Sequence, residues 1–223
     1  MTLVELLVAL AVLSLVSGIG FFVFELGAKS FQTLVVQQGL EAQLRRIAAA
    51  LRRDLLVTNS LGISSNTSRS AIFEGQSFPR HALCFPGVSD WKGPQAYEPS
   101  SGLPNWDRYL LYYANTQPTG RLFRCQIDPP GGAFAAAPLA AFATSPSLYL
   151  LDNPKLVPDC ESVTSLTQEL LEFAVQASAG NARVGLHVKL LDDKAPQAGG
   201  AGRKQYLQEI QLELTALNTF PQL

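Results

Sequence analysis

Side chains that could support chemistry are few in this sequence, and the most unusual is Glu5, a carboxylate within the otherwise apolar run from Thr2 to Phe24. A carboxylate in such a run costs a few kcal/mol on entering lipid, so it requires a compensating partner. The positive end of a helix dipole and the α-amino group of Met1 could both compensate it, within the chain or from a neighbouring chain. The alternative is a glutamate at the membrane interface that reaches into the headgroups.

The other ionisable residues do not form a recognisable catalytic or metal-binding motif. His81 and His187 lack the spacing of a zinc motif, and no nucleophile elbow, phosphate-binding loop or dinucleotide-binding loop occurs. His187 falls on the polar side of an alternating segment, where we expect a solvated side chain. Asp128 and the pair Asp192–Asp193 could contribute to a calcium site, but solvated turns are the simpler interpretation. We therefore expect that the protein binds no metal or cofactor and is not an enzyme. A membrane-anchored hydrolase is the alternative.

The three cysteines are Cys84, Cys125 and Cys160, and none belongs to a CxxC pair. If the domain lies outside the cytoplasm, one disulfide and one remaining thiol are expected, and that thiol could equally be buried and inert. Cys125 ends a predicted strand and Cys160 lies in a loop rich in Pro and Asp. A bond between these two would stabilise the fold by about 3–4 kcal/mol through loop closure. Three pairings are open, and Cys125–Cys160 is preferred.

The apolar run that contains Glu5 predicts a membrane-spanning helix. As a helix it is roughly 34 Å long, enough to cross the hydrocarbon core of a bilayer. No basic region precedes it and the helical pattern continues into Glu25, so a retained anchor fits better than a secretory signal peptide. The composition agrees, with 47% hydrophobic and only 16% charged residues. The net charge of −1 gives no reason to expect a nucleic-acid partner.

An amphipathic segment extends this helix to about Leu56. Apolar residues recur there on one face of a 3.6-residue period: Leu40, Leu44, Ile47, Leu51 and Leu55. Glu41 and Arg45 form an i,i+4 pair, and Arg46, Arg52, Arg53 and Asp54 are expected on the polar side. This arginine cluster predicts a solvated face or salt bridges between subunits, with contact to DNA as the alternative.

The remaining chain predicts a β-rich domain after a polar linker at 64–70. Strands are expected at 109–114 and 121–127, joined as a hairpin, at 169–177 in preference to a short helix, and at 183–191 and 205–215. The alternation in the last two is typical of half-buried antiparallel strands. The sequence thus predicts an α+β fold, in which a long N-terminal helix packs against an antiparallel β-sheet domain. The expected parts are the apolar helix 1–24, its amphipathic extension 25–58 and the domain 59–223.

Residues 129–146 are low in complexity and carry no charge. A loop rich in Pro, Gly and Ala is the simplest interpretation. Phe134, Leu139 and Phe142 within it would alternatively form an apolar contact with a neighbouring subunit.

The first ten residues, MTLVELLVAL, resemble the mature N-terminus of type IV pilin-like proteins. The resemblance implies that a prepilin peptidase removes a leader and methylates the new N-terminal amine, here that of Met1. A start methionine in place of the family's usual phenylalanine is the alternative. It further implies that Glu5 pairs with the N-terminal amine of an adjacent subunit. Membrane lipid would surround the helix before an inner-membrane assembly platform builds it into the filament.

Residues 40–56, with the Arg-Arg pairs and Arg-Asp-Leu, are similar to the helix of W-like minor pilins and J-class minor pseudopilins. Many major pilins have a proline where this chain has Phe22, and Gly18 and Gly20 are the nearest residues that could loosen the helix. The resemblance therefore implies a minor pilus subunit or a type II secretion pseudopilin. A membrane-anchored adhesin or DNA-uptake receptor is the alternative from another class. The implied location is single-pass in the inner membrane with the domain outside the cytoplasm, and then a periplasmic or surface filament.

Overall fold

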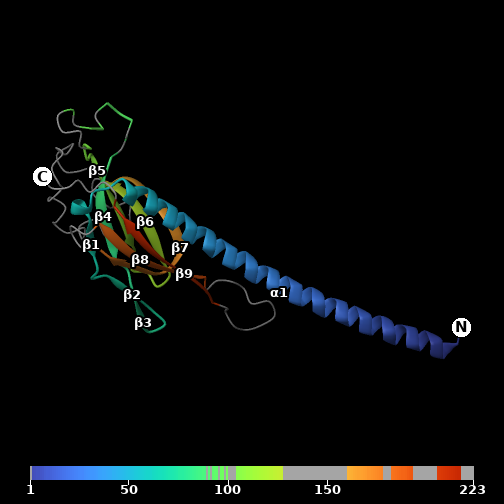
Figure 1. Cartoon of the computed structure of the whole chain (residues 1–223). Helices are drawn as coiled ribbons and strands as arrows, with labels where there is room; N and C mark the ends of the chain where they lie inside the picture. The colour runs from blue at the N-terminus through green and yellow to red at the C-terminus, as the bar shows by residue number, and fades with distance from the viewer. Residues whose placement is uncertain are drawn as a thin grey trace. The chain divides into compact units, whose positions relative to one another are not determined.

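The computed structural model describes residues 2–88, 90, 92–94, 96, 97, 99, 104–127, 160–177, 182–192 and 205–216. Within these residues one helix precedes a set of strands (Figure 1): α1 (Leu3–Leu56), β1 (Ser64–Asn66), β2 (Ser70–Phe73), β3 (Gln76–Pro79), β4 (Ala82–Gly87), β5 (Arg108–Ala114), β6 (Gly120–Ile127), β7 (Cys160–Gln176), β8 (Arg183–Asp192) and β9 (Tyr206–Thr215). A short 3-10 helix, Ser60–Gly62, follows α1. The fold is α+β, as the sequence predicts.

The helix α1 is continuous from its apolar start to its amphipathic end. The described residues fall into two compact units, one with residues 2–39 and 205–206, the other with the described residues from 40 to 192 and from 207 to 216. In the second unit α1 buries one stripe of side chains, and the stripe contains all five apolar residues expected from the 3.6-residue period. The helix also ends at Leu56, where the sequence predicts its end. Both predictions are confirmed.

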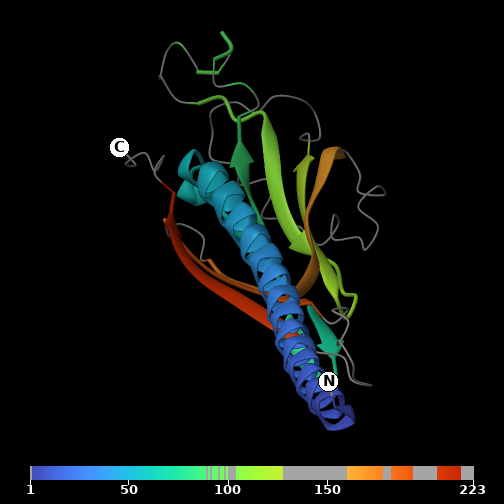
Figure 2. The ribbon, with the colours of Figure 1, turned by 90° about the vertical axis from the view of Figure 1, so that its right-hand side faces the viewer.

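Seven strands form one antiparallel sheet in the order β1-β4-β5-β6-β7-β8-β9, and β2 and β3 form a separate hairpin. The strands β5 and β6 pair as the predicted hairpin, with Leu111 opposite Cys125. The predicted strands at the end of the chain are confirmed as β8 and β9. Figure 2 shows the sheet curling around the last turns of α1, which lie in the same unit.

The strand β7 is 17 residues long and bends from one partner to another. Its first half pairs with β6 and its second half with β8, with several register shifts on the way. Such β-bulges bend a strand and increase its twist, which accounts for the curl of the sheet. The expected strand at 169–177 is thus confirmed, and it begins earlier, at Cys160.

Both faces of the strands β4 and β5 are buried, with the sole partly buried position of β5 at Arg108, and β6 buries the face that carries Phe123, Cys125 and Ile127. On one face Phe85 stacks on Tyr112, with ring centroids 5.8 Å apart. This face lies against the end of α1, because the Tyr112 hydroxyl hydrogen bonds to Asp54. The opposite face forms an apolar cluster: Ala82, Cys84, Trp106, Tyr109, Leu111, Tyr113, Phe123, Cys125 and Ile127.

Three details of the sequence interpretation are wrong. The polar linker at 64–70 contains β1, which pairs with β4, and the start of β2. The strand β4 is not predicted, because all residues of Ala82–Gly87 are buried and the run therefore shows no alternation of apolar and polar residues. Cys160 lies at the start of β7 rather than in a loop.

Candidate functional site

The first turn of α1 holds Glu5 in a capping box. The Thr2 backbone N–H donates to Glu5 Oε2 at 2.8 Å, and the Glu5 N–H donates to Thr2 Oγ1 at 3.4 Å. These two reciprocal bonds satisfy backbone donors that a helix start leaves without partners. The Thr-x-x-Glu spacing is a sequence signal for this motif that the sequence interpretation missed. Met1, the expected partner of Glu5, lies outside the described residues.

The helix that follows is covered with exposed apolar side chains on every side. Every large apolar residue from Leu3 to Phe24 is exposed: Leu3, Val4, Leu6, Leu7, Val8, Leu10, Val12, Leu13, Leu15, Val16, Ile19, Phe21, Phe22, Val23 and Phe24. By length and composition this part of α1 could cross a membrane once. A helix that is apolar all round requires lipid or other protein around it.

Within this segment the structure satisfies the polar groups locally. The Ser14 hydroxyl donates to the Ala11 carbonyl at 2.8 Å, which removes the cost of an unpaired hydroxyl in lipid. The helix runs unbroken through Gly18 and Gly20, and a Cβ atom added at either would meet nothing within 4 Å. Their small size thus leaves room for another helix to approach closely.

Polar contacts begin where the apolar run ends. Lys29 Nζ lies 2.7 Å from Glu25 Oε1, an i,i+4 ion pair. One turn later the Thr33 hydroxyl lies 3.0 Å from the Tyr206 hydroxyl. Both Thr33 and Tyr206 belong to the first unit. This change from apolar to paired polar residues marks the end of the stretch that lipid could surround.

At the other end of α1, Asp54 is buried against the sheet and joins three cationic or hydroxyl groups. Arg124 Nε and the Tyr112 hydroxyl each donate to Asp54 Oδ2 at 2.6 Å, and Arg53 Nε donates to Oδ1 at 2.9 Å. Burial alone would raise the pKa of Asp54, but the hydrogen bonds from Arg124, Tyr112 and Arg53 outweigh it and hold that pKa below its usual value. The same contact raises the pKa of Arg124.

The Asp54 cluster fixes how the helix sits on β5 and β6. The carboxylate must meet two groups on neighbouring strands, Tyr112 and Arg124, so rotating or sliding α1 by one residue would break both bonds. The expectation that Asp54 lies on the polar side is therefore wrong. The sequence predicts that Asp54 lies on the helix, but it does not predict that Tyr112 and Arg124 of the sheet contact it.

A second polar cluster joins β7, β8 and β9. Glu172 is buried, its carboxylate hydrogen bonds with His187 Nδ1 at 3.0 Å, and it forms an ion pair with Lys189 Nζ at 3.1 Å. His187 Nε2 also lies 3.4 Å from Glu209 Oε2, an ion-pair distance without hydrogen-bond geometry. The expectation of a solvated His187 is wrong, because carboxylates of both neighbouring strands flank it.

Arg80 is completely buried near the same cluster. Its guanidinium donates to the carbonyls of Leu170, Pro118 and Gln117 at 2.7, 2.9 and 3.3 Å. Burial lowers the pKa of Arg80 to about 10, and the charge of Glu172 opposes this change. The side chain thus stays charged at neutral pH and crosslinks the loop after β5 to β7.

The three cysteines are not bonded to one another in this structure, and two of them lie on the adjacent strands β6 and β7. Cys125 is buried in the apolar cluster, and the partly exposed Cys160 packs against that cluster while its thiol donates to the Ser162 carbonyl at 3.4 Å. Cys84 is buried in β4 and is separated from Cys125 by Leu111 of β5. The structure therefore brings together the pair that the sequence favours.

A groove lies between the end of α1 and β9, the last strand of the sheet. Its helix side carries the exposed Arg45 and Arg52 with Ala48 and Ala49 between them. Its sheet side is lined mainly by apolar residues: Ile210, Leu212 and Leu214, with Glu213 and Thr215. Arg45 pairs with Glu41 at 3.4 Å, as the spacing predicts. The groove thus combines an apolar floor with charged residues of both signs on its rim, Arg45, Arg52 and Glu213.

The expected contact residues Phe134, Leu139 and Phe142 lie outside the described residues. In the part of the chain that the structure describes, no group of three or more His, Cys, Asp or Glu side chains could hold a metal ion. Comparison with protein-family models, curated proteins and solved structures finds no match for this chain, so its function must be argued from its own residues.

Proposed function

We propose that this chain is a minor subunit of a type IV pilus or of the related type II secretion pseudopilus. One observation carries the proposal: a single continuous helix is apolar and exposed all round from Leu3 to Phe24, contains one carboxylate at Glu5, and buries its far end in a β-sheet domain. A simple membrane anchor requires the apolar length, and it would need the Glu5 side chain only as a helix cap, which requires no negative charge.

The exposed apolar helix supports assembly with other subunits. Its side chains are covered by membrane lipid before assembly and by the helices of neighbouring subunits in the filament core. Glycines 18 and 20 offer positions where another helix can come close. The groove lined by Arg45 and Arg52 offers a second contact surface on the domain.

The role of Glu5 divides into two parts that different substitutions separate. In the single chain the carboxylate caps the helix through Thr2, a role that glutamine fills equally well. In the filament its negative charge neutralises the N-terminal amine of an adjacent subunit, a role that glutamine cannot fill. Charge, rather than hydrogen-bonding capacity, is therefore what the proposed assembly requires of Glu5.

The proposal includes a route for the chain. A prepilin peptidase processes and methylates the N-terminus at Met1, and the chain then stands in the inner membrane with its domain outside the cytoplasm. An inner-membrane assembly platform transfers it into the filament beside other pilin or pseudopilin subunits. Its place is in the priming or tip complex.

The experiment compares Glu5→Ala, Glu5→Gln and Thr2→Ala in the full chain. We expect all three to insert into the membrane. Glu5→Ala and Glu5→Gln should lower incorporation into sheared filaments at least about tenfold, because an uncompensated charge in an apolar core costs a few kcal/mol. Thr2→Ala, which removes the hydroxyl acceptor of the capping box and keeps the charge of Glu5, should incorporate nearly normally.

Two outcomes would contradict the assembly role. If Glu5→Gln incorporates like the unaltered chain, the charge is dispensable and Glu5 serves only as a helix cap. If no variant changes incorporation, the helix is an anchor and nothing more. Quantitative immunoblotting of membrane and filament fractions distinguishes these outcomes.

A further inference from the structure

We propose that Cys125 and Cys160 form a disulfide, and that a β-bulge at the start of β7 exists in this fold to bring them together. The two residues lie on adjacent antiparallel strands, β6 and β7. Cys160 packs against the apolar cluster that contains Cys125, and its thiol donates to the Ser162 carbonyl at 3.4 Å, a bond that the disulfide would replace. This proposal does not depend on filament assembly.

The register of β6 and β7 explains why the two side chains meet. Cys125 lies opposite Val163 and Gln126 opposite Ser162, as in a regular ladder. A regular ladder would next place Ile127 opposite Glu161, and Cys160 would then point to the other face of the sheet. Instead Ile127 lies opposite Cys160. The one-residue bulge at Glu161 thus turns Cys160 to the face that carries Cys125.

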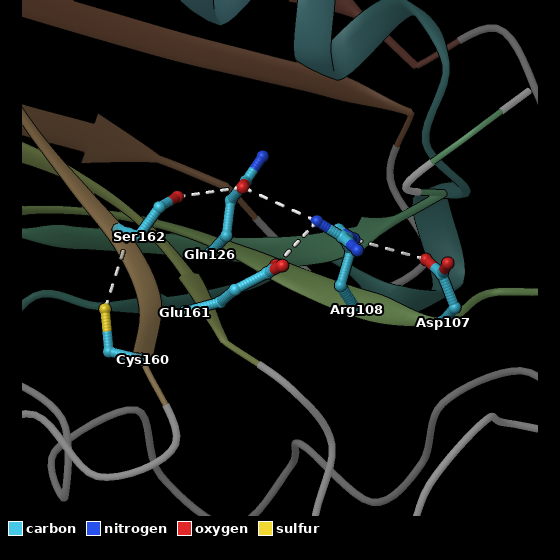
Figure 3. Close-up of polar contacts among 6 residues, drawn as sticks. All are labelled: Asp107, Arg108, Gln126, Cys160, Glu161 and Ser162. Carbon is cyan, nitrogen blue, oxygen red and sulfur yellow. Dashed lines mark hydrogen bonds and ion pairs between the residues drawn. The ribbon is translucent and has the colours of Figure 1, made fainter.

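Polar contacts hold this bulge in place, as Figure 3 shows. Arg108 Nη1 lies 2.9 Å from Glu161 Oε2, and the Ser162 hydroxyl donates to Gln126 Oε1 at 2.8 Å. Asp107 lies 3.4 Å from Arg108 Nε on its other side. The extra residue of the bulge, Glu161, is therefore tied to β5 across the intervening β6.

Cys84 cannot replace either partner. It shares a row with Leu111 and Cys125 on consecutive strands, so two strand spacings, roughly 9–10 Å, separate it from Cys125. Disulfides require Cα atoms within about 7 Å. Burial also raises the pKa of the Cys84 thiol, so little reactive thiolate is present. The structure thus assigns Cys84 as the remaining free thiol.

The different exposure of the two thiols sets the order of the reaction. The partly exposed Cys160 thiolate attacks a disulfide-bearing oxidant, either oxidised glutathione or a protein thiol oxidase, and releases one thiol of that oxidant. The Cys125 thiolate then attacks the Cys160 sulfur, forms the intramolecular bond and displaces the second thiol. Two cysteines are oxidised, one oxidant disulfide is reduced, and the two cysteine protons end on the oxidant's thiols. Burial raises the pKa of Cys125, so the second step is the slow one in the folded chain.

The test uses the full chain in detergent, reduced and then oxidised with oxidised glutathione. We expect one titratable thiol under denaturing, non-reducing conditions, none in Cys84→Ala, and a peptide mass that links residues 125 and 160. Reducing the bond should lower the melting temperature of the Cys84→Ala chain by about 10 °C, because the bond closes a loop of about 35 residues. Three titratable thiols, a bond to Cys84 or a bond only between chains would overturn the proposal.

The bulge is tested separately with Glu161→Gln, which removes the ion pair to Arg108. This change should slow formation of the disulfide by about two- to fivefold, because that factor corresponds to the free energy that a partly exposed ion pair contributes. Glu213→Gln is the matched control, because it removes the cross-strand pair with Arg183, 3.4 Å long, elsewhere on the sheet. Equal rates for the two variants would overturn the role of the bulge.

Discussion

At the scale of single residues, Asp54 shows how one buried carboxylate can fix a helix on a sheet. Removing one partner of a buried ion pair costs about 3–5 kcal/mol, because the other charge stays buried without compensation. Asp54→Asn leaves the charge of Arg124 buried without its partner, so we expect the free energy of unfolding to fall by about 3–5 kcal/mol. Glu41→Gln removes the exposed pair with Arg45 on the same helix and should cost less than about 1 kcal/mol. Thermal unfolding of both variants in the same detergent gives the comparison.

The same residue predicts how stability depends on pH. Because the pKa of Asp54 is lower in the folded than in the unfolded chain, its contribution is fully present above the unfolded value of about 3.9. It is lost as the pH falls below that value and through the folded pKa. The loss of stability between pH 5 and pH 2 should therefore be smaller in Asp54→Asn than in the unaltered chain. Equal slopes would show that Asp54 carries no such linkage.

At the scale of elements, the sequence predicts those helices and strands whose apolar residues recur at a regular spacing. The helix end and the strands β5, β6, β8 and β9 follow from apolar spacing and alternation, which depend only on local order. The strand β4 and the bulge in β7 could not be predicted, because a fully buried run has no alternation and a bulge depends on the partner strand. For the same reason the buried contacts of Asp54 and His187 were missed: their partners are distant in sequence.

The two ends of α1 offer a further test at this scale, because the same substitution should act differently along one helix. Leu51 is 0% exposed and Leu34 is 54% exposed. Leu51→Ala removes buried methyl groups and should destabilise the domain by about 2–5 kcal/mol. Leu34→Ala should change stability by less than about 0.5 kcal/mol in the isolated chain. Chemical denaturation of the two variants tests this, and equal losses would mean that Leu34 packs as a core residue.

At the scale of the whole molecule, the buried core and the exposed apolar surface belong to different stretches of the chain. The described buried apolar side chains all lie between Leu40 and Ala216. The exposed apolar surface of α1 is concentrated before Glu25, where none of the side chains is buried. The residues that form the core are therefore separate from those that could lie in a membrane, as the proposed transfer of a subunit from lipid to filament requires.

This separation predicts that a chain beginning at Glu25 folds without the apolar helix. It should be soluble without detergent and should melt cooperatively within a few degrees of the full chain, because no buried core residue is removed. If the chain is the filament subunit that we propose, the same truncation should abolish incorporation into filaments, since both Glu5 and the apolar surface are lost. Calorimetry of the truncated chain beside the full chain in detergent measures the first effect, and filament fractionation the second. Loss of the cooperative transition would show that residues before Glu25 contribute to the core, and the separation of folding from anchoring would fail.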